Sequence, residues 1–174
     1  SEPILPLRLF KNRVFAATSA IGFVVGFGMF GAITYLPVFL QVAKGASPTG
    51  SGLQLIPVMA GVLVTSVGTG FLITRWGRYK IFPVLGTAVM TLGLYLLSTV
   101  GANTPNGRMY LYMVIFGIGL GGVMQVLVIA VQNAVKYTDL GVATAGATFF
   151  RSIGGSFGTA VFGAIFANVL GGRL

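Results

Sequence analysis

The chain has 174 residues, of which 55% are hydrophobic and only 7% are charged, and its eleven basic and two acidic residues give a net charge of +9. A soluble domain carries about 25% charged residues, so this composition excludes a water-soluble domain and indicates a membrane protein. The basic residues lie at the ends of apolar runs and not on one face, which argues against nucleic-acid binding. Cysteine and histidine are absent, which excludes a disulfide framework and the usual thiolate and imidazole metal ligands.

Five apolar segments are each about long enough to cross a bilayer, at roughly 20 residues per span. They are continuous, whereas the strands of a membrane barrel alternate in segments of about 10 residues. The sequence therefore predicts an all-α polytopic membrane protein with five transmembrane helices. The predicted parts are a cytoplasmic lead-in at 1–13, spans at about 14–41, 52–74, 81–100, 109–135 and 142–170, and an extracytoplasmic end at 171–174.

The basic residues between the spans predict the orientation, because cytoplasmic loops carry the excess of lysine and arginine. If the amino end is inside, seven such residues face the cytoplasm and three face outward, and the inverted topology reverses this bias. We therefore expect a multi-pass protein of the plasma (cell inner) membrane with a cytoplasmic amino end. The odd number of spans and the missing initiator methionine lead us to expect a fragment of a longer protein. The inner residues are Arg8, Lys11, Arg13, Arg75, Arg78, Lys80 and Lys136, and the outer residues are Lys44, Arg108 and Arg173.

Pairs of glycines four residues apart occur inside three of the predicted spans. Small residues at this spacing let helix backbones approach closely in lipid, where no hydrophobic force drives helices together. The pairs predict sites of helix packing, or alternatively surfaces along which helices slide during a transport cycle. They are Gly22 and Gly26, Gly117 and Gly121, and Gly154 and Gly158.

A short basic loop, Gly70-Phe-Leu-Ile-Thr-Arg-Trp-Gly-Arg-Tyr-Lys80, joins the second and third spans. Gly70 and Gly77 bracket it and allow close helix approach and unusual backbone angles. The loop resembles the signature of the major facilitator superfamily, G-x-x-x-D-R-x-G-R-[RK], between the second and third helices of a six-helix half. Thr74 replaces the acid of that signature, so the contact implied for the acid is lost. Two roles stay open for the loop, a topology determinant and a part of the cytoplasmic gate; its cations are Arg75, Arg78 and Lys80.

Three further segments resemble the carboxyl half of fourteen-helix drug:proton antiporters in the same superfamily. They are Leu5–Arg13 before the first span, Tyr35–Gln41 at its end, and Gly141–Gly158 in the last span. The resemblance covers nearly the whole chain and implies helices seven to eleven of the twelve-helix count. It also implies that the last helix and the amino half are missing, and that transport proceeds by proton-coupled alternating access.

Arg151 is the sharpest single candidate for a functional residue. It lies about nine residues into the last apolar run, where a charge costs at least about 2.5–3.5 kcal/mol. No acid lies within the predicted spans, and Asp139 is in the preceding loop. The partner of Arg151 is then a carbonyl, a cytoplasmic vestibule or an acid of the missing half. The alternative is that Arg151 reaches the headgroups along its own aliphatic stem.

A second group of candidates consists of polar side chains within the spans. Gln125 and Gln132 are seven residues apart, on one face of the fourth predicted helix, with Asn133 beside them. Buried amides need hydrogen-bond partners or water, so this face is expected to look into the bundle. Bonds between helices and the lining of a substrate cavity are both compatible with the pattern. Tyr35 is a weaker candidate of the same kind.

No nucleophile–base pair, phosphate-binding loop or metal-ligand spacing can be assembled, so the sequence predicts neither an enzyme nor a cofactor. The prediction is part of a secondary active transporter for multidrug or toxic-compound efflux. Its expected partners are the lipid bilayer, the missing amino-terminal half, protons, and an apolar or cationic small molecule, with no nucleic acid. The alternatives are a major-facilitator importer of a sugar or metabolite, and a non-transporting membrane scaffold subunit.

Overall fold

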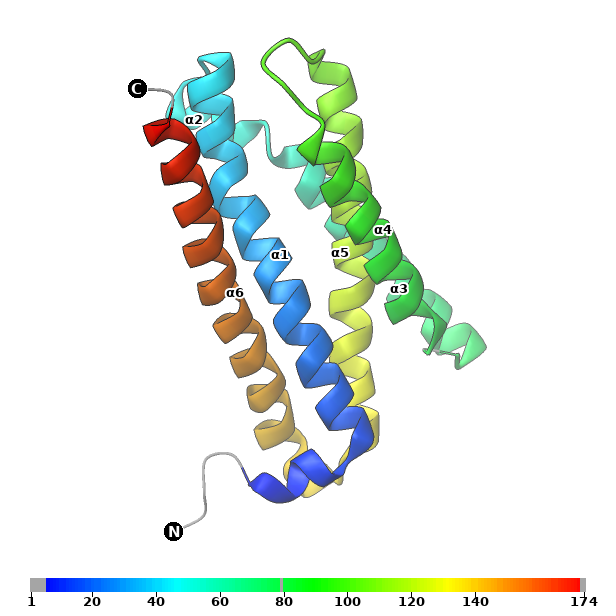
Figure 1. The fold of residues 1–174 in the computed structure, drawn as a ribbon. Coiled ribbons are helices and arrows are strands. Elements are labelled where there is room, and N and C mark those ends of the chain that lie inside the picture. Colours follow the sequence, from blue (N-terminus) through cyan, green and yellow to red (C-terminus); the bar gives the residue numbers. More distant parts are fainter. Residues whose placement is uncertain (1–5, 79, 173–174) are drawn as a thin grey trace. The chain divides into compact units, whose positions relative to one another are not determined.

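A computed structural model describes residues 6–78 and 80–172 of the chain. Within these ranges all regular elements are helices, and five segments are long and apolar enough to cross a membrane. This confirms the predicted all-α membrane fold. Leu5 of the lead-in and Arg173 of the predicted outer end lie outside the described residues. The elements are η1 (Leu7–Lys11), α1 (Arg13–Lys44), α2 (Pro48–Leu53), α3 (Ile56–Trp76), α4 (Ile81–Ser98), α5 (Asn106–Ala134), η2 (Tyr137–Asp139) and α6 (Leu140–Gly171) (Figure 1).

Local sequence signals determine where the first helices end. Gly45 follows α1 with a φ of 65°, a left-handed conformation that glycine adopts without strain. The hydroxyl of Ser47 then accepts a hydrogen bond from the Gly50 N–H at 3.0 Å and caps α2, which begins with Pro48. Gly77 ends α3 in the same left-handed region, and its N–H donates to the Ile73 carbonyl.

The chain divides into two compact units, each formed from sequence-distant parts. Unit 1 comprises residues 1–35 and 127–174, and unit 2 comprises residues 36–126. Helices α1 and α5 each contribute residues to both units. The two units are described separately below.

In unit 1, α1 and α6 run parallel in very close contact (Figure 1). Gly154 and Gly158 of α6 lie against the backbone carbonyls of Phe23 and Phe27 of α1, where an added Cβ would overlap the carbonyl oxygens. Gly26 of α1 makes the corresponding contact from the other side, because a Cβ there would overlap the backbone of α6. Small residues thus allow the two backbones to approach each other closely.

The amino-terminal end of unit 1 is held together by an apolar cluster and two polar contacts. Leu9 of η1 is buried with Phe15, Val131 and Ala143. The side chain of Asn12 accepts a hydrogen bond from the Val14 N–H at 3.0 Å, and so caps α1. Its amide nitrogen also donates to the carbonyl of Ala134, the last residue of α5, at 2.6 Å. Nearby, Arg8 Nη2 donates to Asp139 Oδ1 at 2.8 Å.

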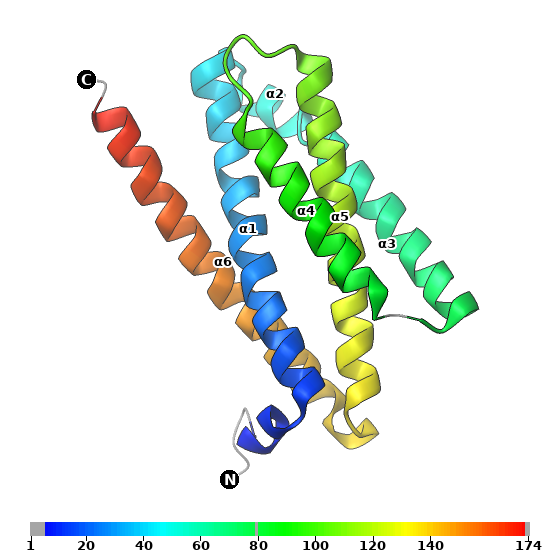
Figure 2. The same ribbon diagram turned by 45° about the vertical axis from the view of Figure 1, so that its right-hand side comes forward.

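In unit 2, α5 lies beside both α3 and α4 (Figure 2). Gly117 and Gly121 contact the backbone of α3 at Val58 and Val62, and these two helices run parallel. Gly119 lies on another side of α5 against Met90 of α4, which runs antiparallel. Alternate glycines of the run Gly117–Gly122 therefore serve two different neighbours.

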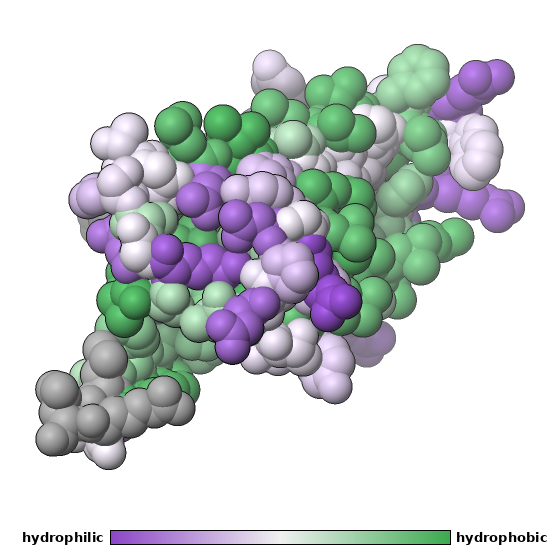
Figure 3. Space-filling model, turned by 90° about the horizontal axis from the view of Figure 1, so that it is seen from above, coloured by the Kyte–Doolittle hydropathy of each residue, from purple (hydrophilic) through white to green (hydrophobic). Residues whose placement is uncertain are grey.

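Apolar side chains cover the flanks of the helices, while polar residues collect at the helix end viewed in Figure 3. On α3, Leu63, Val64 and Val67 are each about two-thirds exposed or more. Such a surface is stable in lipid and would aggregate in water. At one end of unit 2, the ammonium of Lys44 donates to the Thr104 carbonyl at 2.5 Å and to Asn106 Oδ1 at 3.0 Å.

Candidate functional site

Arg151 lies on α6 in unit 1 and is half-buried. Its backbone carbonyl meets Gly26 of α1, and its side chain lines a narrow, largely enclosed pocket with room for about one water molecule. The pocket lies between segments of α1, α5 and α6 that all belong to unit 1. Its lining residues are Thr18, Gly22, Leu127, Val128, Val131, Thr144, Ala147, Thr148 and Arg151.

Besides Arg151, the polar side chains that line this pocket are three threonines. The Thr18 hydroxyl points to the carbonyls of Val14 at 2.8 Å and Phe15 at 3.0 Å, and the Thr148 hydroxyl donates to the Thr144 carbonyl at 3.0 Å. Because the protons of these two hydroxyls are used within their own helices, Thr18 and Thr148 can offer only oxygen lone pairs to a further partner. Among the pocket-lining residues of the described chain, none carries a carboxylate.

The threonines that share the pocket with Arg151 are not among the functional residues predicted from the sequence. On α6, Thr144 and Thr148 are seven and three residues before Arg151, which places all three on one helical face. This spacing is the signal that could have found them. Thr18 comes from α1, more than 100 residues away, and nothing local in the sequence connects it to Arg151.

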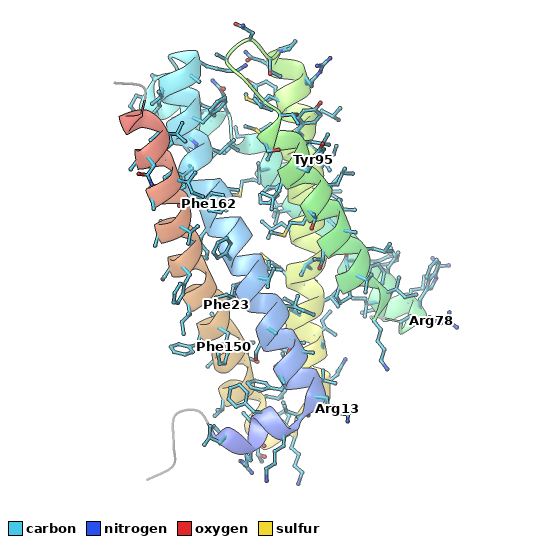
Figure 4. All side chains as sticks on the ribbon, in the orientation of Figure 1. Arg13, Phe23, Arg78, Tyr95, Phe150 and Phe162 are labelled. Carbon is cyan, nitrogen blue, oxygen red and sulfur yellow. The ribbon has the colours of Figure 1, made fainter. Side chains whose placement is uncertain are left out.

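Tyr35 of α1 contacts α6 through both its hydroxyl and its ring. Its hydroxyl donates to the Thr159 carbonyl at 3.0 Å, and its ring lies 6.4 Å from Phe162 and 5.8 Å from Phe166 between ring centroids. The Phe162 ring also contacts Phe27; Phe23 and Phe162 mark this α1–α6 pair in Figure 4. The structure therefore places the hydroxyl of Tyr35 in a contact between two helices.

The three candidate amides of α5 are in different surroundings. Gln125, in unit 2, is half-buried, with its amide nitrogen near Gly70 of α3. Gln132 and Asn133, in unit 1, are exposed. Within the described residues, Gln125 is thus partly covered, whereas Gln132 and Asn133 lie on the surface, and the role of all three stays a prediction.

The basic loop lies in unit 2. Arg75, Arg78 and Lys80 are all exposed, and Arg78 lies beyond the end of α3 (Figure 4). Thr74, at the position of the signature's acid, donates its hydroxyl proton to the Phe71 carbonyl at 2.8 Å. This local bond occupies the only proton that its side chain could offer to a neighbouring helix.

Comparison with known proteins gives a consistent family assignment. Residues 1–159 match the model of the Major Facilitator Superfamily. Over 98% of its length the chain is 53% identical to an uncharacterized MFS-type transporter of Mycobacterium tuberculosis, covering 25% of that protein.

Two further relatives have names that refer to drug transport or drug resistance. The chain is 42% identical to the multidrug transporter protein MdtP of Bacillus subtilis, over 99% of the chain and 32% of the relative. It is 39% identical to a tetracycline resistance determinant of Streptomyces rimosus, over 98% of the chain and 49% of the relative. The chain thus spans a quarter to a half of the length of these relatives. The match across most of the chain and the helical membrane fold together show that this protein belongs to the Major Facilitator Superfamily of transporters.

Proposed function

We propose that this chain is the carboxyl-terminal part of a secondary active transporter that exports apolar or cationic toxic compounds in exchange for protons. The observation that carries the proposal is the alignment of nearly the whole chain with a multidrug transporter and a tetracycline resistance determinant. The remaining part of the carrier would supply an amino-terminal half, and the two halves would rock around a central site. The amino end of this chain would face the cytoplasm across the plasma membrane.

Arg151 is the residue of this chain that we assign to coupling. A cation inside a span is expensive and usually marks a functional position. Its pocket contributes threonine oxygens but no carboxylate among the residues described. The proton-carrying acid of an antiporter would therefore belong to the remaining part of the carrier. The guanidinium of Arg151 would favour the ionised form of such an acid when it approaches.

The exposed amides and the basic loop have supporting roles in this proposal. Gln132 and Asn133 expose amides on a helix that crosses the membrane. Amides are poorly tolerated in hydrocarbon, which supports a position facing the rest of the carrier or its substrate path. Arg75, Arg78 and Lys80 would keep the α3–α4 loop at the cytoplasmic surface.

The test uses the complete gene in a bacterial strain that lacks its main efflux pumps. Cells that express the carrier are expected to accumulate less ethidium and less tetracycline, and a protonophore should abolish the difference. The variant Arg151→Gln should lose efflux at unchanged membrane abundance. The matched control is Arg108→Gln, which removes an exposed arginine near the start of α5. Equal dye accumulation with and without the carrier, while another solute is transported, would refute the efflux proposal.

A further inference from the structure

One end of unit 1 carries a concentrated positive charge. Four cations lie there within η1, at the start of α1 and just after α5, and all four are exposed. We call this group the basic end. It consists of Arg8, Lys11, Arg13 and Lys136.

Two polar contacts bring these cations together from both ends of the sequence. Asn12 donates to the Ala134 carbonyl at 2.6 Å, so its neighbours Lys11 and Arg13 lie beside the end of α5. Lys136 follows Ala134 by two residues and therefore lies at the same place. Arg8 bonds to Asp139 at 2.8 Å, at the start of α6. Arg13 is the first residue of α1 and lies next to η1 (Figure 4).

Among the residues that the structure describes, the charge of the basic end is largely uncompensated. Asp139 is the single carboxylate side chain in the described part of the chain, and its partner is Arg8. Four cations and one carboxylate leave a charge of +3 at this end. Like charges gathered at one end of a unit repel each other, so an anionic partner would relieve an unfavourable arrangement.

Apolar side chains accompany these cations. Leu9 is buried in the cluster with Phe15, which fixes η1 against the end of the unit. Its neighbour Leu7 is 80% exposed, and Tyr137 of η2 is 89% exposed. Tyrosine is enriched where a membrane meets water, because its ring is apolar and its hydroxyl is polar. A partner for this surface must therefore offer both negative charge and an apolar boundary.

We propose that the basic end is a binding site for the headgroups of anionic phospholipids. Lys11, Arg13 and Lys136 contact the phosphate, while Leu7 and Tyr137 enter the boundary between headgroups and acyl chains. Basic clusters next to membrane helices attract anionic lipids in this way. A nucleic acid offers the phosphate but no apolar boundary, so a lipid fits both features of the surface.

The experiment measures lipid retention by native mass spectrometry on the purified complete gene product. The protein is titrated in detergent with phosphatidylglycerol or with zwitterionic phosphatidylcholine. The expected result is a preference for phosphatidylglycerol that falls at least roughly tenfold in the triple variant Lys11→Gln, Arg13→Gln, Lys136→Gln, given that each cation contributes a substantial share of the attraction.

The control is a variant with the same change in charge elsewhere, Arg75→Gln, Arg78→Gln, Lys80→Gln. It should retain most of the preference. An equal loss in both triple variants would mean that the preference follows net charge alone, which would overturn the proposal. Retention of phosphatidylcholine equal to that of phosphatidylglycerol in the unmodified protein would overturn it as well.

A second variant keeps the proposal testable if the triple variant does not fold. Asp139→Asn leaves all four cations in place and releases Arg8 from its ion pair. The basic end then gains one positive charge, and phosphatidylglycerol retention should rise severalfold. Unchanged or weaker retention in a folded Asp139→Asn protein contradicts the site.

Discussion

Gly154 of α6 lies so close to Phe23 of α1 that a methyl group at position 154 would overlap the backbone carbonyl oxygen of Phe23. A backbone atom cannot move aside as the end of a flexible side chain can. Position 154 therefore tolerates only glycine at the present distance between the two helices.

The variant Gly154→Ala should accordingly destabilise the protein, by about 1–3 kcal/mol as for other overpacked sites. The measurement is the melting temperature of the detergent-solubilised protein, followed by size-exclusion chromatography after heating. Gly141→Ala on the same helix is the control, because its Cβ would meet no atom within 4 Å. That variant should melt at the same temperature or higher, since alanine is the better helix former. Equal losses in both variants would contradict the packing explanation.

Removing the hydroxyl of Tyr35 tests the polar contact between α1 and α6. Tyr35→Phe keeps the ring packing and deletes the hydrogen bond to the Thr159 carbonyl, which measures 3.0 Å. The free energy of unfolding should fall only slightly, by about 0.6 kcal/mol, the average for such bonds in membrane proteins. Tyr95→Phe on α4 is the comparison, because Tyr95 is 67% exposed. Its melting temperature should not change, whereas that of Tyr35→Phe should fall.

Asn12 joins the start of α1 to the end of α5 through both atoms of its amide. Asn12→Ala removes the cap of α1 and leaves the Ala134 carbonyl without its donor. We expect the free energy of unfolding to fall by about 0.5–2 kcal/mol from the loss of the cap alone. Asn12→Asp keeps an acceptor for the Val14 N–H but places a carboxylate oxygen opposite the Ala134 carbonyl. It should therefore fail to restore stability. Full recovery in Asn12→Asp would show that the bond to Ala134 contributes nothing, and the exposed Asn133→Ala serves as the neutral reference.

Lys44 holds the connection between α4 and α5 through its bonds to Thr104 and Asn106. In Lys44→Met these acceptors lose their donor, and the backbone amides of residues 101–104 and 106 should exchange hydrogen faster. Hydrogen–deuterium exchange with peptide-level mass spectrometry measures this directly. Arg108→Met provides the comparison, since Arg108 is exposed on the first turn of α5. Identical exchange at 101–106 in wild type and Lys44→Met would show that the lysine does not restrain this loop.

The sequence predicts the number and type of the membrane helices well, because apolar length is a strong and local signal. Finer features escape it for physical reasons. Pro37 lies inside α1 without ending it, which membrane helices tolerate. The sequence does signal the interruption of the α-helix at 54–55, because the polar Gln54 precedes it and Pro57 stands in the first turn of α3.

The candidate site is predictable only in part. A lone arginine in an apolar run identifies Arg151 from composition alone. The threonine of α1 that shares its pocket depends on which face of α1 meets α6, and this is decided by packing between segments that are far apart in the sequence. For the same reason, the ion pair of Arg8 and Asp139 spans 131 positions and could not have been inferred from either residue alone.

The contacts of α1 and α6 repeat with one interval on both helices, since Gly154 and Gly158 are four residues apart and so are Phe23 and Phe27. A slide of four residues, about 6 Å, would bring Gly158 against Phe23 but would place Phe162 against the Phe27 carbonyl. A phenylalanine does not fit where glycine now meets a backbone carbonyl, so the neighbouring register is disfavoured. The hydroxyl of Tyr35 meets α6 at one position only. This single bond therefore helps to select one register of the helix pair.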